Sequence, residues 1–455
     1  KDRCPQSGRS FARANQRPAS KLFLARNGSI AGHSRIFPIS PHCTIECRKT
    51  ILVPPVLLLL STYPYHKPQH GGQLRLANIA KAYQAAGWLV QGIAVYEPRA
   101  YDAGCIGRLD IAFPPESHYR LFDGQSVPAT DDLLSGHYAS ADDGGWSSVL
   151  ANLPPSITAI HVEQPWMWPV ARRIASLPAY RGVKLIYGSQ NIESVLKRDI
   201  FDSLGVNDCK GAIEAIELLE RQAVSEADLC LAVTESDHQV LQQMGACQTL
   251  MAPNGIQPWR ASEKALERWR ARLPKAPWIL YVASAHPPNY TGLIDCIGDS
   301  LACIPPNAKL VIAGGVSEHV YHCFAPTRWS TLNLSRLELL FVLADEDLAA
   351  VKTLAHAYLL PIQHGGGSNI KTAEALYSGK YVIGSEAAFR GFQSFTQLPE
   401  VTVARSPTQF QQAMRSVLQR ESLNPVPVAP GDMRHTLRWD QCLASVPAAV
   451  ANLNR

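Results

Sequence analysis

Short, continuous apolar runs alternate with amphipathic segments along most of this chain, and this alternation limits the fold more than any other feature. Residues 56–60 are five consecutive apolar residues, as expected of a parallel strand buried on both faces. A loop with Gly71 and Gly72 follows, and residues 74–86 then show a helical repeat of apolar positions. Residues 89–95 form the next apolar run. The order strand, loop, helix, strand is the unit of a doubly wound parallel sheet.

The same pattern occurs in two halves of the chain. Between them, residues 257–276 are rich in Arg, Lys, Glu and Trp and indicate a linker that contains a helix. Residues 98–150 show no clear pattern. Further strands are predicted at residues 159–162, 183–187, 229–233, 278–282, 308–313, 337–343, 358–362 and 381–384. Further helices are predicted at residues 165–177, 213–227, 236–244, 290–304, 345–357, 368–378, 407–420 and 437–453.

These patterns predict an α/β fold with two Rossmann-like lobes that face each other across a cleft. A length of 455 residues agrees with about two or three domains. In sheets of this kind, ligands bind at the carboxyl ends of the strands. The expected parts are a basic, poorly ordered extension, an N-terminal lobe, a linker, a C-terminal lobe and a final helix that can cross back to the first lobe. Their ranges are 1–50, 51–258, 259–276, 277–430 and 431–455.

The charge distribution argues against a nucleic-acid-binding protein. Residues 1–50 hold ten basic and two acidic residues, which give this segment a net charge of +8. Because the whole chain has a net charge of +5, the remaining residues together carry −3. A near-neutral body lacks the basic surface that nucleic acid requires. The apolar residues 51–60 are too few to span a membrane and are interpreted as leading into the first strand. The eleven cysteines include no C-x-x-C pair, which favours free thiols in a reducing compartment.

The most informative segment for function joins a buried strand to a helix through three glycines at residues 365–367. Glycines let the backbone approach a ligand closely, and amides at a helix start favour an anion. Ser368 can cap the helix and can also meet a phosphate. Lys371 and Glu374 share one helix face, so a cation and a carboxylate follow the loop in turn. This arrangement suits a nucleoside diphosphate; the alternative is a surface Lys–Glu pair after an ordinary loop.

Residues 365–374 resemble the signature of glycosyltransferase family 4, in the subgroup where Gly-Gly-Gly-Ser/Thr precedes x-x-Lys-x-x-Glu-Ala. The broader family carries Glu-x7-Glu. Glu374 corresponds to the second glutamate, which the resemblance implies would hold the ribose, and the first falls on Gly366. Residues 387–391, Ala-Ala-Phe-Arg-Gly, also resemble the family.

Shorter matches follow in the family's order over about residues 56–455, and together they strengthen the resemblance. They are Gly71-Gly72, similar to a glycine loop beside the donor phosphates, and Asn191-Ile192-Glu193. The end of the first lobe matches at 218–227, 232–234 and 253–255, and the start of the second at 284–289. The chain also departs from the family. Many members carry an Arg and a Lys that face the diphosphate, and residues 284–292 hold neither; Gln190 stands where many have His.

The resemblance implies a retaining transferase that moves a sugar from a nucleotide-sugar donor to a hydroxyl of a saccharide or lipid-linked acceptor. Departure of the nucleoside diphosphate is the difficult step, and cations and oriented amides stabilise its developing charge. Lys371 and His161 are the candidate catalytic residues. His161, Asn191 and Glu193 are also candidates for the acceptor or sugar side, in the N-terminal lobe. The candidate donor-binding residues are Gly71, Gly72, Gly366, Gly367, Ser368, Asn369, Lys371 and Glu374.

No cofactor, metal or nucleic-acid partner is expected. The expected setting is the synthesis of a cell-envelope or exported polysaccharide in the cytoplasm, with peripheral association at the inner face of the membrane left open. Two alternatives stand beside the transferase: a nucleotide-sugar 2-epimerase of the same fold, which needs further acid and base carboxylates, and an inactive binding protein. The sequence does not identify the base, the sugar or the acceptor.

Overall fold

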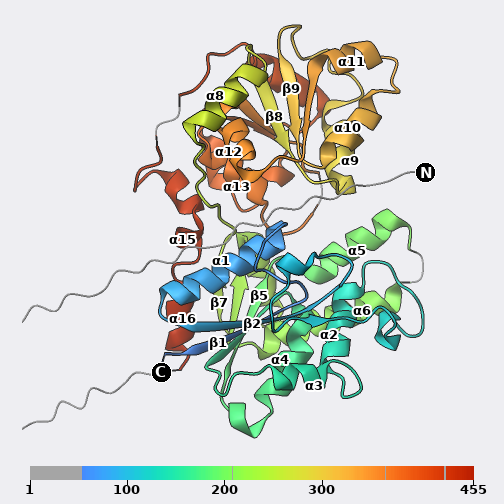
Figure 1. The fold of residues 1–455 in the computed structure, drawn as a ribbon, viewed down its shortest axis with the longest axis vertical. Helices are drawn as coiled ribbons and strands as arrows, with labels where there is room; N and C mark the ends of the chain where they lie inside the picture. The colour runs from blue at the N-terminus through green and yellow to red at the C-terminus, as the bar shows by residue number, and fades with distance from the viewer. Residues whose placement is uncertain (1–53, 207–208, 364, 425–426, 455) are drawn as a thin grey trace, which may run out of the picture. The chain divides into compact units, whose positions relative to one another are not determined.

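Two parallel β-sheets with helices packed on them organise the chain (Figure 1). The computed structural model describes residues 54–454, except 207, 208, 364, 425 and 426. The extension expected at residues 1–50 lies outside the described residues. We call the first sheet with its helices the N-terminal lobe and the second sheet with its helices the C-terminal lobe.

The first sheet has seven strands in the order β3-β2-β1-β4-β5-β6-β7, and all neighbouring strands in it are parallel. The strands are β1 (Val56–Ser61), β2 (Leu89–Tyr96), β3 (Ile111–Ala112), β4 (Ala159–Glu163), β5 (Lys184–Ser189), β6 (Leu229–Ala232) and β7 (Thr249–Met251). The second sheet has six parallel strands in the order β10-β9-β8-β11-β12-β13. They are β8 (Trp278–Val282), β9 (Lys309–Ala313), β10 (Leu337–Phe341), β11 (Ala357–Leu360), β12 (Tyr381–Gly384) and β13 (Val401–Val403).

The strand order changes direction at β1/β4 in the first sheet and at β8/β11 in the second. At such a switch point the connections leave in opposite directions, and the carboxyl ends of the two strands open a crevice that binds ligands. Each lobe therefore has one favoured site. In both lobes this site lies next to a glycine-containing loop, after β1 and after β11.

Helices connect the strands in both lobes (Figure 1). Those of the N-terminal lobe are α1 (Gly71–Ala85), α2 (Asp131–Ser140), α3 (Trp146–Ala151), α4 (Trp168–Ala175), α5 (Glu193–Leu204), α6 (Lys210–Glu226) and α7 (Glu235–Gln243). Those of the linker and the C-terminal lobe are α8 (Glu263–Arg272), α9 (Pro287–Ile297), α10 (Val316–Phe324), α11 (Ser330–Arg336), α12 (Asp345–Leu354), α13 (Ile370–Tyr377) and α14 (Pro407–Val417). No helix among the described residues has both the length and the apolar character needed to cross a membrane.

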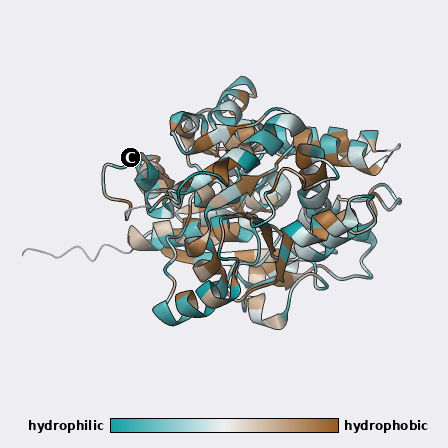
Figure 2. Cartoon of the chain, turned by 90° about the horizontal axis from the view of Figure 1, so that it is seen from above, coloured by the Kyte–Doolittle hydropathy of each residue, from teal (hydrophilic) through white to brown (hydrophobic). Residues whose placement is uncertain are grey.

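Each sheet has a hydrophobic core on both faces, which explains why its central strands are continuously apolar. Leu58 and Leu60 of β1 belong to one buried cluster, and Leu57 and Leu59 belong to another. All four side chains are fully buried because successive residues of a strand point to opposite faces. Figure 2 shows the same division by colour: the strands are mostly brown, whereas the helices carry both brown and teal.

The end of the chain packs on the N-terminal lobe. Trp439, Leu443 and Val446 belong to the same buried cluster as Leu57 of β1 and Leu76 of α1. This segment contains a 3-10 helix (Met433–Leu437), α15 (Trp439–Cys442) and α16 (Val446–Asn452). In Figure 1 the red α16 lies against the blue α1, and contacts join these two helices.

Several elements differ from the sequence-based expectations: helices α5, α10 and α11 were not predicted, and the helix predicted at residues 290–304 is α9, which ends at Ile297. The single helix predicted at residues 437–453 is interrupted, since α15 ends at Cys442 and α16 begins at Val446. Pro447 explains the break, because within a continuous helix its ring would clash with the carbonyl of Leu443. Residues 98–150, which showed no clear pattern, contain the two-residue strand β3 and the helices α2 and α3.

Candidate functional site

A cavity of about 490 Å³ lies where loops from both switch points meet, and we call it the central cavity. Its walls come from the loop after β1, the turn after β5, the lobe junction, the loop after β8, and helices α12 and α13. The lining residues are Gln69, His70, Gly71, Gly72, Leu74, Gln190, Asn191, Asn254, Val282, Ala283, Ser284, Leu348, Lys352, Ser368, Asn369, Ile370, Lys371 and Glu374.

Most of the residues predicted to bind a donor line this cavity: Gly71, Gly72, Ser368, Asn369, Lys371 and Glu374. Asn191, predicted for the acceptor or sugar side, lines it as well. Gly366, Gly367, His161 and Glu193 are not among the lining residues. The structure therefore assembles the predicted helix-start site but leaves these four residues out of its lining: Gly367, His161 and Glu193 are buried, and Gly366 is exposed.

The glycine loop is packed against a turn of the N-terminal lobe. A Cβ atom on Gly366 would lie 2.7 Å from Asn191 Oδ1, and one on Gly367 would lie 2.2 Å from the backbone oxygen of Gln190. Gly367 also has a φ of +56°, in the left-handed region that favours glycine. Both glycines are thus needed for the approach of residues 190 and 191, and their contact with a phosphate stays a prediction.

Helix α13 begins at Ile370, two residues later than predicted, and has a different cap. The Asn369 side chain accepts a hydrogen bond of 3.0 Å from the Lys371 amide, so Asn369 is the N-cap residue. The prediction that Ser368 caps the helix is wrong. Its hydroxyl oxygen is buried without a hydrogen-bond partner among the described residues, while its carbonyl accepts a 3.1 Å bond from Asn254 Nδ2.

Lys371 lies at the start of α13 and reaches toward the loop after β8. Its Nζ donates to Asn289 Oδ1 at 2.8 Å. Burial lowers the pKa of Lys371 from 10.5 to about 8, although the nearby Glu374 carboxylate acts in the opposite direction. A buried ammonium with only a neutral partner is incompletely compensated, so an incoming anion would stabilise its charge.

Glu374 lies one helical turn further along α13 and pairs with a lysine that the sequence analysis did not single out. Lys352 Nζ of α12 lies 2.7 Å from Glu374 Oε1. One feature of the sequence could have indicated that Lys352 faces the protein: it directly follows the buried residues 349–351 of an amphipathic helix. What the sequence does not show is that α12 and α13 bring these two side chains together.

Arg390, which follows β12, is the second cation that was not predicted. Its Nε donates to the Gly367 carbonyl at 3.3 Å. Burial lowers the pKa of this guanidinium, and the Asp237 carboxylate opposes that shift. Arg390 therefore holds the glycine loop from behind, and it is not among the residues that line the cavity.

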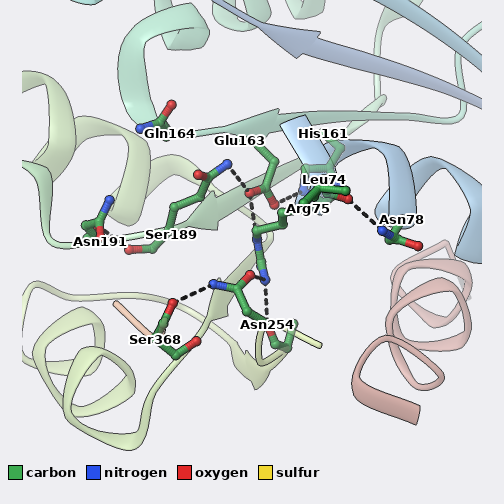
Figure 3. A network of polar contacts seen from close by, with 12 residues as sticks. Leu74, Arg75, Asn78, His161, Glu163, Gln164, Ser189, Asn191, Asn254 and Ser368 are labelled. Atoms are coloured by element: carbon green, nitrogen blue, oxygen red, sulfur yellow. Dashed lines mark hydrogen bonds and ion pairs between the residues drawn. The ribbon is translucent and has the colours of Figure 1, made fainter. Parts of the chain in front are cut away.

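A buried polar network lies beneath the cavity in the N-terminal lobe (Figure 3). Arg75 Nε of α1 lies 2.8 Å from Glu163 Oε2, and His161 Nε2 lies 3.0 Å from Glu163 Oε1. Burial alone raises the pKa of Glu163, but the Arg75 guanidinium and His161 together outweigh it and hold the pKa at about 2. Gln190 Nε2 donates to the same carboxylate at 3.0 Å.

His161, predicted to contact the transferring sugar or the acceptor, belongs to this network. Its side chain is fully buried, and its Nδ1 lies 3.5 Å from the Tyr83 hydroxyl of α1. The residue lies inside β4, and its side chain points into a core face. The geometry gives His161 a place behind Glu163 and away from the cavity wall.

The network reaches the other lobe through Asn254. Arg75 Nη1 donates to the Ala252 carbonyl at 2.7 Å and to Asn254 Oδ1 at 3.2 Å. Asn254 in turn donates to the Ser368 carbonyl, as the dashed lines in Figure 3 show. A continuous chain of polar contacts thus runs from Glu163, at the end of β4, to Ser368, which precedes the cap of α13.

Glu193 lies behind Asn191 and supports it. Its carboxylate accepts hydrogen bonds from Gln164 Nε2 at 2.9 Å and from Asn191 Nδ2 at 3.1 Å, and the residue is 1% exposed. Burial raises the pKa of Glu193 to about 7, against the opposing effect of these two amides. Gln164 has a φ of +67°, a strained value for a non-glycine residue of the kind that clusters at functional sites.

Several solved structures are similar to this chain in fold. No family model matches the sequence, and no curated protein matches it. Sucrose-phosphate synthase from Thermosynechococcus elongatus is similar in structure: it is 15% identical, the match covers 88% of this chain and 99% of that chain, and the TM-score is 0.61. The chain has the GT-B architecture.

Two further solved structures share this architecture. Anabaena HepE, in complex with UDP, is 16% identical over 88% of this chain and 97% of that chain, with a TM-score of 0.53. The catalytic domain of starch synthase IV from Arabidopsis thaliana, bound to ADP and acarbose, is 12% identical over 88% and 98%, with a TM-score of 0.55. The predicted fold class, two Rossmann-like lobes across a cleft, is confirmed.

Proposed function

We propose that this chain is a glycosyltransferase that uses a nucleotide-sugar donor. The observation that carries the proposal is the start of α13, where Lys371 and Glu374 follow the glycine loop and both face the central cavity. Gly71 and Gly72, at the start of α1, line the same cavity from the other lobe. Solved structures of the same architecture include HepE with UDP-glucose and starch synthase IV with ADP, which supports a nucleoside diphosphate here.

In this proposal the Lys371 ammonium and the amides at the start of α13 bind the diphosphate, and Glu374 accepts hydrogen bonds from the ribose. These groups would stabilise the charge that develops on the leaving diphosphate, which is the main requirement of the transfer step. Asn191, held by Glu193, would lie on the acceptor or sugar side. We give His161 and Glu163 a positioning role through Arg75 and Gln190, because neither lines the cavity.

The proposal includes three further points, which rest on residues 365–374. They are membership of glycosyltransferase family 4, retention of configuration and a metal-independent reaction. Among the described residues, no group of three His, Cys, Asp or Glu side chains could hold a metal ion. A saccharide or lipid-linked acceptor, and a role in envelope or exported polysaccharide at the cytoplasmic face of a membrane, stay predictions from the resemblance.

The epimerase alternative is less well supported by the cavity. Of the described residues that line it, Glu374 alone has a carboxylate, and that carboxylate is paired with Lys352. An epimerase would need acid and base groups beside the sugar. The inactive binding protein differs from the transferase in turnover alone, so measurements of binding and of donor cleavage separate the two.

The test combines thermal stability with donor hydrolysis. UDP, ADP and GDP and their glucose conjugates are screened, and a ligand at 100 times its Kd should stabilise the fold by ~2.7 kcal/mol. Lys371→Met should weaken binding about tenfold or more, because a charge-assisted contact to phosphate is lost. Lys380→Met is the matched control, since Lys380 is a partly buried lysine of the same lobe that donates to the Leu423 carbonyl.

Release of free nucleotide and monosaccharide from the donor would support the transferase over the binding protein. If no nucleoside diphosphate or sugar conjugate stabilised the wild-type chain, the proposed function would be wrong. Equal affinity of the wild type and Lys371→Met would remove α13 from the donor site.

A further inference from the structure

The pair formed by Lys352 and Glu374 joins two helices at the wall of the central cavity. Lys352 lies on α12 and Glu374 on α13, and Nζ and Oε1 are 2.7 Å apart. The Lys352 side chain is 10% exposed, whereas that of Glu374 is 27% exposed. Both residues line the cavity, so the pair presents its carboxylate side to a ligand and its ammonium side to the protein.

Lys352 is itself held in place from the protein side. Its Nζ lies 5.3 Å from the centre of the Trp259 ring, within reach of a cation–π interaction. Its carbonyl accepts a 2.9 Å hydrogen bond from the Tyr358 hydroxyl. A lysine anchored in this way can fix the direction of the carboxylate that it contacts.

The contact occupies one oxygen of the carboxylate. Among the described residues, no side chain donates to the other oxygen, Oε2, of Glu374. A carboxylate with one oxygen fixed by a cation has fewer orientations than a free one, so its second oxygen is prepared to accept a hydrogen bond from a ligand. The nearby Lys371 ammonium adds a second positive charge on the same side of the cavity.

We propose that Lys352 is a positioning residue that orients Glu374 toward the ribose 2′-hydroxyl and so makes the site select ribonucleotides over 2′-deoxyribonucleotides. This inference rests on the proposed function, because it takes Glu374 as the ribose ligand. It adds a specificity that follows from the pair: donors built on thymidine diphosphate, which lacks the 2′-hydroxyl, would be disfavoured.

The expected discrimination follows from the loss of one hydrogen bond to a charged group. Such a bond changes affinity by about 10- to 100-fold. The wild type should therefore bind UDP about 10- to 100-fold more tightly than 2′-deoxy-UDP. Without Lys352, Glu374 can turn away, and the ratio of the two affinities should fall to about threefold or less.

The experiment measures Kd for UDP and 2′-deoxy-UDP by calorimetry, with the ADP and GDP pairs run in parallel because the base is unknown. Lys352→Met should lower the ratio, and Lys352→Arg, which keeps a cation, should restore most of it. Glu374→Ala should lower the ratio equally. Lys371→Met should weaken both nucleotides while the ratio is kept, and Lys380→Met should change neither.

Each result has one meaning. If no nucleoside diphosphate binds the wild type, the proposed function fails. If both nucleotides bind and the ratio falls in Glu374→Ala but not in folded Lys352→Met, Glu374 binds the ribose without help from Lys352 and the inference is overturned. If Lys352→Met weakens both nucleotides equally, Lys352 serves the phosphates instead and the inference is again overturned.

Discussion

Lys371 is the residue on which the proposed donor site depends most, and its protonation can be followed. Burial places its pKa at about 8, below the ordinary 10.5, so the side chain loses its charge as the pH rises through about 8. The affinity for UDP should be constant below that pH and fall by up to about tenfold per pH unit above it. Calorimetry from pH 6.5 to about 9.5 measures this. Lys371→Arg stays charged and should flatten the profile; a wild-type profile as flat as that of the arginine variant would contradict the assignment.

Glu163 should control stability in acid. Its pKa in the folded chain, about 2, is lower than its ordinary value of 4.5, so its stabilising effect is complete above about 4.5 and is lost as the pH falls toward 2. At neutral pH, Glu163→Gln leaves the Arg75 guanidinium buried without its counter-charge and should cost about 3–5 kcal/mol.

Urea unfolding at pH 7 and at pH 3 measures both effects of this change. Glu263→Gln is the control, because Glu263 forms an exposed ion pair with Arg270 and should contribute less than about 1 kcal/mol. Equal losses in the two variants would show that the buried pair has no special importance.

At this scale the sequence predicted the residues that a local pattern defines. Lys371 and Glu374 were found because three glycines and a helix start fix their spacing. Lys352 and Arg390 were not, since they reach the site from helices and loops whose positions depend on packing. His161 was predicted as a ligand contact because residues near the end of a strand often face a cleft, but alternation along β4 turns its side chain into the core.

At the scale of elements, the turn at residues 190 and 191 packs against the glycine loop at residues 365–367 and limits which side chains the loop can carry. Gly367 and Gly205 have similar φ values, +56° and +65°, so alanine costs about 1 kcal/mol of backbone strain at either position. A Cβ on Gly205 would meet no atom of the described residues within 4 Å, whereas one on Gly367 would lie 2.2 Å from the Gln190 oxygen. Gly367→Ala should therefore destabilise the fold by about 1–3 kcal/mol more than Gly205→Ala.

Gly367→Ala should also weaken UDP binding, because the loop that leads into α13 must move. Thermal unfolding and calorimetry on the two variants give the comparison. If the two variants had the same thermal stability and the same affinity for UDP, the turn at residues 190 and 191 would not limit the loop.

Elements were easiest to predict where burial makes them regular. The strands with core on both faces, such as β1 and β8, appear in the sequence as continuous apolar runs. The segment at 98–150 could not be interpreted, because β3 has two residues and the helices there are short. The end of the chain was predicted as one helix, and the effect of Pro447 was missed.

For the whole molecule, the C-terminal segment completes the core of the N-terminal lobe. Trp439 is 5% exposed and packs in the cluster that contains Leu57 and Leu76. Trp439→Ala should cost about 3–5 kcal/mol. Trp329→Ala is the control, since Trp329 is 39% exposed and its removal should cost less than about 1 kcal/mol. Urea unfolding measures both, and a small effect at Trp439 would mean that the lobe is stable without its last segment.

The two-lobe plan could be predicted because each half repeats the same alternation of strand and helix. How the halves meet could not, since it depends on contacts between distant residues. Asn254 reaches Ser368, and Gly255 lies so close to the returning chain that a Cβ there would be 2.7 Å from the Trp439 nitrogen. Nothing local in Pro253-Asn254-Gly255 indicates either contact.

The close approach at Gly255 has a consequence for how this molecule could be rearranged. The Ile256 amide donates to the Leu437 carbonyl at 2.8 Å, so the chain leaves the N-terminal lobe and re-enters it at adjacent points. In the order of the chain, the C-terminal lobe is therefore inserted between two adjacent and buried residues, Ile256 and Leu437. A chain in which residues 257–437 are replaced by a short glycine linker would keep all the strands of the first sheet together with Trp439 and α16. C-terminal lobes from related chains could be exchanged at the same two points.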